Sequence, residues 1–374
     1  MKYKLSDICH YVSGKVYVSG LDKSTYISTE NMLPNKGGVT EATTLPNVDL
    51  TQIYQQHDVL VSNIRPYFKK IWFADQEGGC SNDVLVFRAK EGVDPRFLYY
   101  VLADDKFFSH ATATSKGTKM PRGDKKSIME YEVPDFDLDT QKKIASLLGN
   151  IDAKIIVNRE INKNLLQQAR ALYKDRFIDL TPFDGSMPSD WHLGTVSEII
   201  ELHDSKRIPL SSRERAELDK IYPYYGATSV MDYVDRYLFD GIYLLLGEDG
   251  TVVDGQGFPI LQYVEGKFWV NNHAHIITGK NGFTVEMLYL LFSLTNVQSI
   301  VTGAVQPKIS QANLNKVPVV IPSKTELTAF DESIQPFFAE ICNLRTENDR
   351  LVSVRDSLLP RLMSGELDVP DLDL

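Results

Sequence analysis

Two short stretches carry residue types of a catalytic or metal site, and both lack the other members of such a site. Asp124-Lys125-Lys126 has the Asp-x-Lys form of half a nuclease motif, but this triplet is frequent by chance and fits a solvated basic loop. His273 and His275 follow Asn271 and Asn272, yet no acidic or cysteine ligands stand at metal-site spacing. Alternating residues of a strand explain the two histidines better, so we expect no metal site.

The sequence also lacks the motifs of a DNA methyltransferase and of a nucleotide-driven motor. There is no Asn/Asp-Pro-Pro-Tyr motif to hold a target amine, and no Gly-x-x-x-x-Gly-Lys-Ser/Thr phosphate loop. Gly247-Glu248-Asp249-Gly250 and Gly255-Gln256-Gly257 are rich in glycine but lack the spacing of a dinucleotide fingerprint. We therefore expect no catalytic residue and no cofactor in this chain.

Three stretches instead have the composition of a nucleic-acid interface. Residues 115–126 carry five cations and one acid, and residues 63–70 carry three cations and two aromatic residues. Four cations between residues 206 and 215 precede the aromatic run 222–225. Lys and Arg neutralise phosphates, and Arg, Asn and Gln can pair with base edges. The predicted DNA contacts are Asn63, Arg65, Tyr67, Lys69, Lys70, Lys116, Thr118, Lys119, Arg122, Lys206, Arg207, Tyr225, Asn272, Gln306 and Lys308.

A basic loop alone is more often a solvated surface, but this loop recurs. Gly117-Thr118-Lys119-Met120-Pro121-Arg122 corresponds, 186 residues later, to Gly303-Ala304-Val305-Gln306-Pro307-Lys308. Ser6-Asp7-Ile8 similarly resembles Ser197-Glu198-Ile199 at a slightly larger offset. The chain therefore contains an internal repeat, which favours a shared function for the two loops.

The elements that must position these loops include one long helix, predicted over residues 140–178. Its apolar residues alternate in steps of four and three for about four heptads. At about 1.5 Å per residue it would be on the order of 55 Å long, so it needs a partner helix. Asn158 and Asn162 lie in the apolar stripe, where polar residues fix the register of paired helices.

The partner is a second helix in the same chain, again displaced by 186 residues. Arg355 occupies a position that holds Ala in the first helix, and Pro336 predicts a kink or a delayed start. Two unrelated amphipathic helices are the alternative, which the wider repeat disfavours. The predicted contacts are Ile151, Ile155, Asn158, Asn162, Leu165 and Leu172 with Phe337, Ile341, Leu344, Asn348, Leu351 and Leu358.

Composition describes an ordinary globular protein with an acidic balance. The 374 residues are 43% hydrophobic and carry a net charge of −10, which counts against simple nucleic-acid binding. Residues 365–373 supply four of the acids. Cys9, Cys80 and Cys342 are widely spaced and predict free thiols in a reducing cytoplasm. No run is long and apolar enough for a membrane span, and Met1-Lys2-Tyr3-Lys4 leads into no signal peptide.

Both halves follow one predicted order of strands and short helices. Strands are expected at 58–62 and 83–87, a helix from residue 95, and a last strand at 130–134 before the first long helix. Residues 181–188 have turn chemistry and predict a linker. The second half repeats the plan with strands at 243–246, 275–277 and 317–321. The order is domain, helix, domain, helix.

At this point the chain resembles the specificity subunit of a type I restriction-modification system, over nearly its whole length. The resemblance rests on this order, on the Gly-x-x-x-Pro-Arg/Lys loops, and on the helix sequences QKKIASLLGNIDAKI and RLVSVRDSLLPRLMSGELDV. It implies an α+β fold with an internal pseudo-twofold repeat, in which two long antiparallel coiled-coil helices separate two similar α/β target-recognition domains. The implied boundaries are 1–139 and 181–324 for those domains, and 140–180 and 325–374 for the spacer helices.

The resemblance also implies the partners. Each recognition domain would read one half of a split site in double-stranded DNA, and the helices would dock two methyltransferase subunits, with restriction/translocase subunits added. S-adenosylmethionine, ATP and Mg²⁺ would belong to those partners, and the acidic charge fits a subunit that binds DNA well only when assembled. A scaffold joining two adaptor domains, or a stand-alone DNA-modifying enzyme, are the alternatives. A helix spacer of about 55 Å predicts a gap of more than one duplex turn between the half-site centres.

Overall fold

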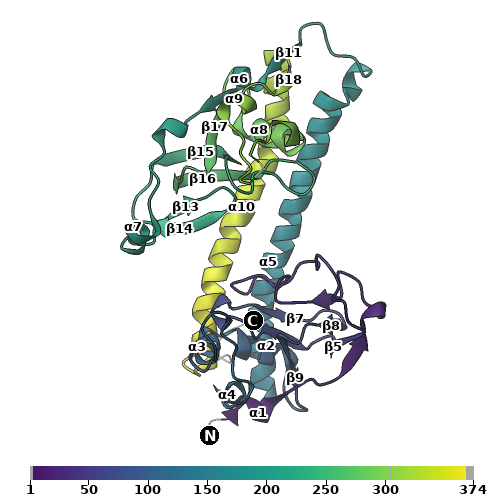
Figure 1. Ribbon diagram of the computed structural model, residues 1–374, viewed down its shortest axis with the longest axis vertical. Helices are drawn as coiled ribbons and strands as arrows, with labels where there is room; N and C mark the ends of the chain where they lie inside the picture. The colour runs from purple at the N-terminus through teal and green to yellow at the C-terminus, as the bar shows by residue number, and fades with distance from the viewer. Residues whose placement is uncertain (1–2, 304, 368–374) are drawn as a thin grey trace. The chain divides into compact units, whose positions relative to one another are not determined.

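The computed structural model describes residues 3–303 and 305–367, and the chain forms two compact units (Figure 1). The first unit comprises Met1–Val157 with Glu347–Leu374, and the second comprises Asn158–Thr346. Each unit therefore contains a globular α/β part and a segment of each long helix. Met1, Lys2 and the acidic tail from residue 368 onward lie outside the described residues.

The first unit is built on a sheet of order β2-β9-β6-β7, whose neighbouring strands are all antiparallel. The central strands β6 and β9 read VLVS and VLVFRA, and such apolar runs suit strands covered on both faces. The Asp94 side chain accepts from Phe97 N at 2.9 Å and caps helix α2, whose first turn carries Pro95. These elements span Cys9–Tyr11 (β2), Val84–Ala89 (β9), Val59–Ser62 (β6), Ile71–Phe73 (β7), Pro95–Ala103 (α2) and Asp105–Ala113 (α3).

A second sheet of the first unit has the order β3-β5-β8-β4, with β4 parallel to β8. The unit also contains a short antiparallel pair, β1 with β10. The elements are Lys15–Tyr17 (β3), Leu50–Tyr54 (β5), Gly78–Cys80 (β8), Tyr26–Ile27 (β4), Tyr3–Lys4 (β1), Glu132–Val133 (β10), Leu5–Ile8 (α1) and Lys125–Met129 (α4).

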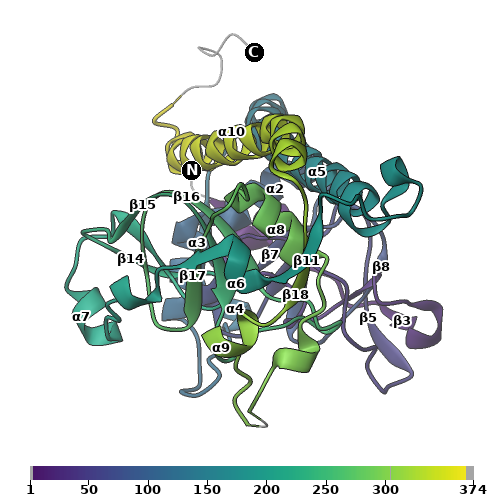
Figure 2. The same cartoon turned by 90° about the horizontal axis from the view of Figure 1, so that it is seen from above.

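The second unit has one sheet of order β12-β17-β15-β16-β13-β14 and a separate pair, β11 with β18. Helix α8 shares one hydrophobic core with β15, β17 and α10, and Figure 2 shows it between β17 and α10. The elements are Ile200–Leu202 (β12), Ala274–Gly279 (β17), Phe239–Gly247 (β15), Leu261–Val270 (β16), Tyr222–Tyr225 (β13), Val230–Val234 (β14), His192–Thr195 (β11), Pro318–Ile321 (β18), Val196–Ile199 (α6), Ser212–Ala216 (α7), Val285–Ser293 (α8) and Gln311–Leu314 (α9).

The two units repeat one topology, which confirms the predicted internal repeat. The order β2-β9-β6-β7 recurs as β12-β17-β15-β16. The pair β1–β10 recurs as β11–β18, and the parallel pair β4–β8 recurs as β13–β16. The strands β3 and β5 of the first unit and β14 of the second have no counterpart in this scheme, so the sheets differ at their outer edges.

The two long helices are α5 (Leu138–Tyr173), which continues into a π-helical turn at Lys174–Ile178, and α10 (Lys324–Met363). They run antiparallel within each unit. In the first unit Asp152 pairs with Arg355 at 2.8 Å and Lys154 with Glu347 at 3.5 Å. In the second, the Tyr173 ring lies 5.7 Å from Phe330, and Arg176 pairs with Glu326. Higher numbers on one helix thus meet lower numbers on the other, as predicted.

Of the two alternatives predicted from Pro336, a kink or a delayed start, the delayed start is wrong, because α10 begins at Lys324 and continues through the proline. Proline removes one helical N–H donor, which costs about 3 kcal/mol in a helix interior. Three apolar side chains of the same stretch, Phe330, Ile334 and Phe338, are buried in the core of the second unit, and their burial offsets that cost.

The residues that α5 and α10 bury also differ in part from the predicted contacts. Leu172 is 43% exposed, and its neighbour Tyr173 is buried instead. Phe338 and Leu359 are likewise more buried than Phe337 and Leu358. Each shift is one residue toward the C-terminus, as expected because 3.6 residues per turn lag behind a strict seven-residue repeat. Of the other predicted contacts, Ile155, Asn158, Ile341 and Leu344 are buried, and Ile151, Asn162, Leu165, Asn348 and Leu351 are half-buried.

Cys9 and Cys80 are buried free thiols, and Cys342 is a half-buried one. Burial raises the pKa of Cys9 and of Cys80 to about 12, so neither thiol is a ready nucleophile. Within residues 3–303 and 305–367, no helix combines the length and the apolar character needed to cross a bilayer.

Candidate nucleic-acid interface

A small hairpin holds the basic loop of the first unit. Lys116 N donates to Arg122 O at 2.8 Å, and Arg122 N donates to Lys116 O at 2.9 Å. Gly117 has a φ of +98°, in the left-handed region that favours glycine, and it begins the turn. Residues 117–120 are exposed at the tip. Thr118 and Lys119 therefore project from a loop whose base is fixed by two backbone hydrogen bonds.

The base of this hairpin is attached to the segment that follows the central strand β6. Arg65 N donates to Pro121 O at 2.8 Å, and Gly123 N donates to Asn63 O at 3.1 Å. The fold thus brings together the two stretches that the sequence marked as basic, residues 63–70 and 115–126.

The second unit builds the same hairpin from different residues. Thr302 N donates to Lys308 O at 2.9 Å, Lys308 N donates to Thr302 O at 2.7 Å, and Gly303 has a φ of +88°. This hairpin is attached to the segment after β15, because Gly250 N donates to Pro307 O at 2.9 Å and Ile309 N donates to Glu248 O at 2.9 Å. Ala304 lies outside the described residues. The repeated loop motif thus corresponds to a repeated structure.

The cations of the first loop lie at the surface in ion pairs that a phosphate could replace. Lys116 pairs with Asp124, and its side chain is 81% exposed. Arg122 pairs with Asp83 at 3.1 Å and is half exposed. Exposed pairs of this kind contribute about 0–1 kcal/mol, so exchanging the carboxylate for a phosphate costs little. Asp124 itself caps α4 by accepting from Lys126 N and Ser127 N, which gives it a structural role.

Asn63 and Arg65 lie at the foot of the first loop with unpaired polar atoms. Asn63 is buried, and its Oδ1 has no hydrogen-bond partner among the described residues; the same holds for Nε of Arg65. The Arg65 Nη2 donates weakly to Lys119 O at 3.4 Å. Buried polar atoms without partners are rare. A polar ligand that reaches these two atoms gains hydrogen bonds without breaking any.

Beside them, Tyr67 and Phe68 form an exposed aromatic pair with ring centroids 4.8 Å apart. Lys69 pairs with Asp105 at 2.8 Å, and Lys70 Nζ donates to Thr29 O at 2.7 Å. Burial lowers the pKa of Lys70. Tyr67 is therefore free to meet a ligand, whereas Lys70 is already engaged with its own chain.

The predicted contacts of the second unit divide into exposed and buried groups. Asn272, Gln306 and Lys206 are exposed, and Gln306 Nε2 donates to Asp249 Oδ1 at 3.3 Å. Lys308 is half exposed and pairs with Glu248 at 3.2 Å. Tyr225 is half-buried, with its ring edge on Phe268 at 5.8 Å between centroids.

Arg207 lies largely inside the second unit, with only 14% of its side chain exposed. Its Nη1 donates to Glu248 Oε2 at 2.5 Å and to Ala274 O at 2.8 Å. These bonds use the donors of the guanidinium, so Arg207 connects residues inside the second unit. A run of basic residues in a sequence cannot distinguish such an internal cation from one that faces solvent.

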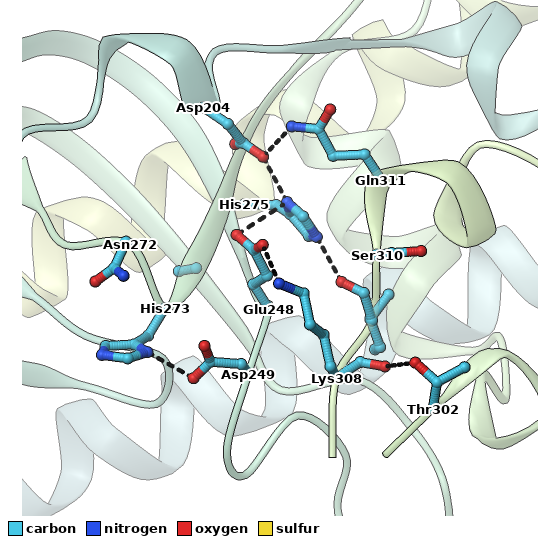
Figure 3. A network of polar contacts seen from close by, with 12 residues as sticks. Asp204, Glu248, Asp249, Asn272, His273, His275, Thr302, Lys308, Ser310 and Gln311 are labelled. Atoms are coloured by element: carbon cyan, nitrogen blue, oxygen red, sulfur yellow. Dashed lines mark hydrogen bonds and ion pairs between the residues drawn. The ribbon is translucent and has the colours of Figure 1, made fainter. Parts of the chain in front are cut away.

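The sequence did not predict the polar cluster behind the second hairpin, Thr302–Lys308, which Figure 3 shows. Asp204, Glu248 and His275 bring one ligand atom each within 4.8 Å of one another. His275 Nδ1 lies 2.6 Å from Asp204 Oδ2 and 3.7 Å from Glu248 Oε2. The acidic neighbours of His275 that the local spacing lacked are thus supplied by distant segments. Asp204 and Glu248 each follow the end of a strand, and this position in the sequence is the signal that could have identified them.

The cluster is neutralised by the chain's own cations. Arg207 contacts both carboxylates, and Lys308 contacts Glu248. Burial alone would raise the pKa of Asp204, but hydrogen bonds from His275, Ile276 N and Gln311, together with the nearby His275 charge, bring the pKa below its ordinary value. His273 lies outside this cluster and contacts Asp249 at 2.5 Å.

Comparison with known proteins decides the family. Residues 1–167 and 188–349 match the sequence profile described as the type I restriction modification DNA specificity domain. The chain belongs to the type I restriction-modification DNA specificity family. It is thus a specificity chain, and the expectation of a non-catalytic subunit is confirmed by this family membership.

Individual relatives agree with this assignment. The specificity chain is similar to the MjaIX specificity subunit of Methanocaldococcus jannaschii, at 25% identity over 76% of this chain and 71% of the relative. It is also similar to the HindI specificity subunit of Haemophilus influenzae, at 22% identity over 98% of this chain and 99% of the relative. The crystal structure of the type I S subunit from M. genitalium superposes with a TM-score of 0.55 at 16% identity, covering 97% of this chain and 96% of that one. That likeness supports the fold.

Proposed function

We propose that each unit of this specificity chain contacts one half of a two-part site in double-stranded DNA. The observation that carries the proposal is the repeated hairpin, Lys116–Arg122 and Thr302–Lys308, attached in both units to the segment after the central strand. A duplicated surface loop of this kind, on a duplicated sheet, supports two related contacts with one ligand. A split duplex sequence is such a ligand.

In the first unit the cations Lys116, Lys119 and Arg122 would neutralise phosphates, and Arg65 and Asn63 would supply polar groups beneath the loop. Displacing the weak surface pairs with Asp124 and Asp83 frees two of these cations for the duplex. Counterions released from the DNA then contribute a salt-dependent gain in affinity.

In the second unit two of the four exposed predicted contacts are neutral amides, whereas those of the first unit include three cations and no amide. Asn272 and Gln306 have the donor and acceptor pair that matches an adenine edge in the major groove. Lys308 and Lys206 would contact phosphates. Compared with the first unit, this unit would therefore contribute more to sequence discrimination and less to salt-dependent affinity.

The helices α5 and α10 would provide the spacer and the docking surface for partners. The expected assembly contains two methyltransferase subunits, with restriction/translocase subunits added. S-adenosylmethionine, ATP and Mg²⁺ would be bound by those partners, and the complex would act in the cytoplasm.

Co-expression with a methyltransferase subunit from the same genome tests the proposal. The purified complex is incubated with a pool of random-sequence duplexes, and retained duplexes are sequenced. We expect enrichment of two short sequences at a fixed separation. A complex that forms but retains duplexes without sequence preference would favour the scaffold alternative, in which paired helices join two adaptor domains.

A further inference from the structure

The hydrogen bonds around His275 determine how many protons its ring carries. His275 Nε2 lies 2.8 Å from the carbonyl oxygen of Ile309, which can only accept, so Nε2 carries a proton. His275 Nδ1 faces Asp204 Oδ2 at 2.6 Å. Asp204 accepts from Ile276 N at 2.9 Å and from Gln311 Nε2 at 2.5 Å, and its pKa lies below the ordinary value, so it is an ionised carboxylate at neutral pH. Nδ1 must then carry a proton as well, and the buried ring is an imidazolium.

Three interactions connect the His275 ring to the second hairpin, Thr302–Lys308. Ile309, whose carbonyl accepts from His275, directly follows Lys308, the last residue of the hairpin. Gln311 continues the same segment and binds Asp204. Lys308 pairs with Glu248, which lies 3.7 Å from His275. Figure 3 shows the contacts of His275 with Asp204 and Glu248, and those of Gln311 and Lys308 with these two carboxylates. The position of residues 308–311 therefore depends on the charged ring.

The charged groups around His275 are its two acidic contacts, Asp204 and Glu248, and the cations that pair with them, Arg207 and Lys308. With His275 protonated, the largely buried His275 and Arg207 meet two carboxylates, and the half-exposed Lys308 adds a third cation. A divalent metal at the same point would need Nδ1 to lose its proton and would meet two fixed cations at close range. The arrangement therefore fits a proton better than a metal.

The first unit provides an internal comparison. In the second unit His275 pairs across the sheet with Leu246, and the equivalent pair in the first unit is Leu85 with Val61. Leu85 is buried and apolar. Asn63 of the first unit is the equivalent of Glu248, because the backbone carbonyl of each accepts a hydrogen bond from the residue that follows its hairpin. The first hairpin thus has no charged ring behind it.

We propose that His275 is a positioning residue which, as an imidazolium, fixes the second hairpin and so sets recognition of one half-site only. This inference rests on the proposed function. It predicts that discrimination at one half-site depends on His275, while discrimination at the other half-site does not.

The test uses the full chain assembled with its methyltransferase subunit. H275L introduces the residue found at the equivalent place in the first unit, and H275Q keeps an N–H donor for Ile309 O without the charge. H192L is the control, because it makes the same change at an exposed histidine on β11. Affinities are measured for a duplex with both half-sites and for duplexes altered in either half. Nitrogen NMR of His275 in the full chain counts its ring protons.

For H275L we expect the affinity ratio between matched and altered duplex to fall about tenfold at one half-site, a typical value for a base-pair mismatch. The ratio at the other half-site stays unchanged, H275Q lies between H275L and the wild type, and H192L behaves as the wild type. A loss of folded protein alone would lower the active fraction and leave both ratios intact, which contradicts the positioning role. NMR should find both ring nitrogens protonated at neutral pH; one bare nitrogen overturns the inference.

Two further outcomes distinguish a failure of this inference from a failure of the proposed function. If the wild-type complex discriminates neither half-site, the proposed function fails, and amide shifts of residues 302–308 in H275L and H192L alone decide the positioning role. If added Zn²⁺ raises the melting temperature of the wild type but not of H275Q, the cluster binds metal and the imidazolium assignment is wrong.

Discussion

Arg122 and Lys308 occupy the same position in two hairpins that lie far apart in the sequence. Each exchanges two backbone hydrogen bonds with the residue that opens its hairpin, Lys116 for Arg122 and Thr302 for Lys308. Their charges have different partners, since Arg122 pairs with the half-exposed Asp83 and Lys308 pairs with Glu248, whose side chain is mostly buried. The backbone of the loop is thus duplicated while its electrostatic setting is not. This difference gives each unit its own expected contribution to DNA binding.

The first prediction concerns the salt dependence of binding. Replacing Lys116, Lys119 and Arg122 together by Ala should weaken DNA binding of the assembled complex at low salt. For every phosphate that the variant no longer neutralises, the slope of log affinity against log salt should become shallower by about 0.9. Titrations between about 50 and 200 mM salt measure this slope. A control variant changes Lys23, Lys280 and Lys316, which are exposed outside the predicted contacts. Equal slopes in both variants would remove the first loop from the interface.

The second prediction concerns the spacer helices. Inserting one heptad into both α5 and α10 adds about 10 Å of helix at 1.5 Å per residue. The gap between the two half-sites should widen by about three base pairs at 3.4 Å each, with both half-sequences unchanged. The motif methylated by the variant complex reports the gap. Altered half-sequences at an unchanged gap would show that the helices do not set the spacing.

The third prediction concerns Arg207, whose guanidinium is held among buried groups. R207A leaves the carboxylates of Asp204 and Glu248 without their main cation. Removing one partner of a buried ion pair costs about 3–5 kcal/mol, so the free energy of unfolding should fall by about that amount. Urea denaturation measures it. R213A, at an exposed arginine of α7, is the control. A small loss of stability with a large loss of DNA affinity would place Arg207 at the DNA instead.

The fourth prediction concerns acid stability. The pKa of Asp204 lies below its ordinary value of 3.8 in the folded chain, so the unfolded chain takes up this proton first as pH falls. The stability that the ionised carboxylate contributes is complete above pH 3.8 and is lost as the pH falls through the folded pKa. D204N should be less stable at neutral pH and lose less stability between about pH 5 and pH 3. D240N, which removes an exposed carboxylate on β15, is the matched control. Parallel curves for D204N and the wild type would contradict the assignment.

The repeat and the long helices could be predicted from the sequence because both are encoded by local spacing. The heptad pattern identified α5 and α10, and the shared glycine and proline identified two repeated loops, which the structure shows to be hairpins. The structure explains Arg355, which occupies a position that holds Ala in the first helix. Its guanidinium pairs with Asp152 at 2.8 Å, and Asp152 also accepts from Tyr100 at 2.7 Å. Polar contacts among three helices, α10, α5 and α2, cannot be read from the apolar period of one helix.

The polar cluster could not be predicted, because its members come from separate segments. Asp204 follows β12, Glu248 follows β15, His275 lies on β17 and Gln311 begins α9. Only the pairing of β17 with both β12 and β15 brings three of them together. The same sheet buries Arg207, which the sequence grouped with exposed cations. Local composition therefore predicted the loops correctly but could not distinguish residues that support a loop from residues that face a ligand.

Mapping of methylated adenines in cells that express this chain with its methyltransferase subunit tests the central claim most directly. We expect one motif made of two short specified sequences, separated by a gap of unspecified bases. The triple loop variant of Lys116, Lys119 and Arg122 should reduce methylation at that motif. A single uninterrupted motif, or methylation that does not depend on this chain, would contradict it.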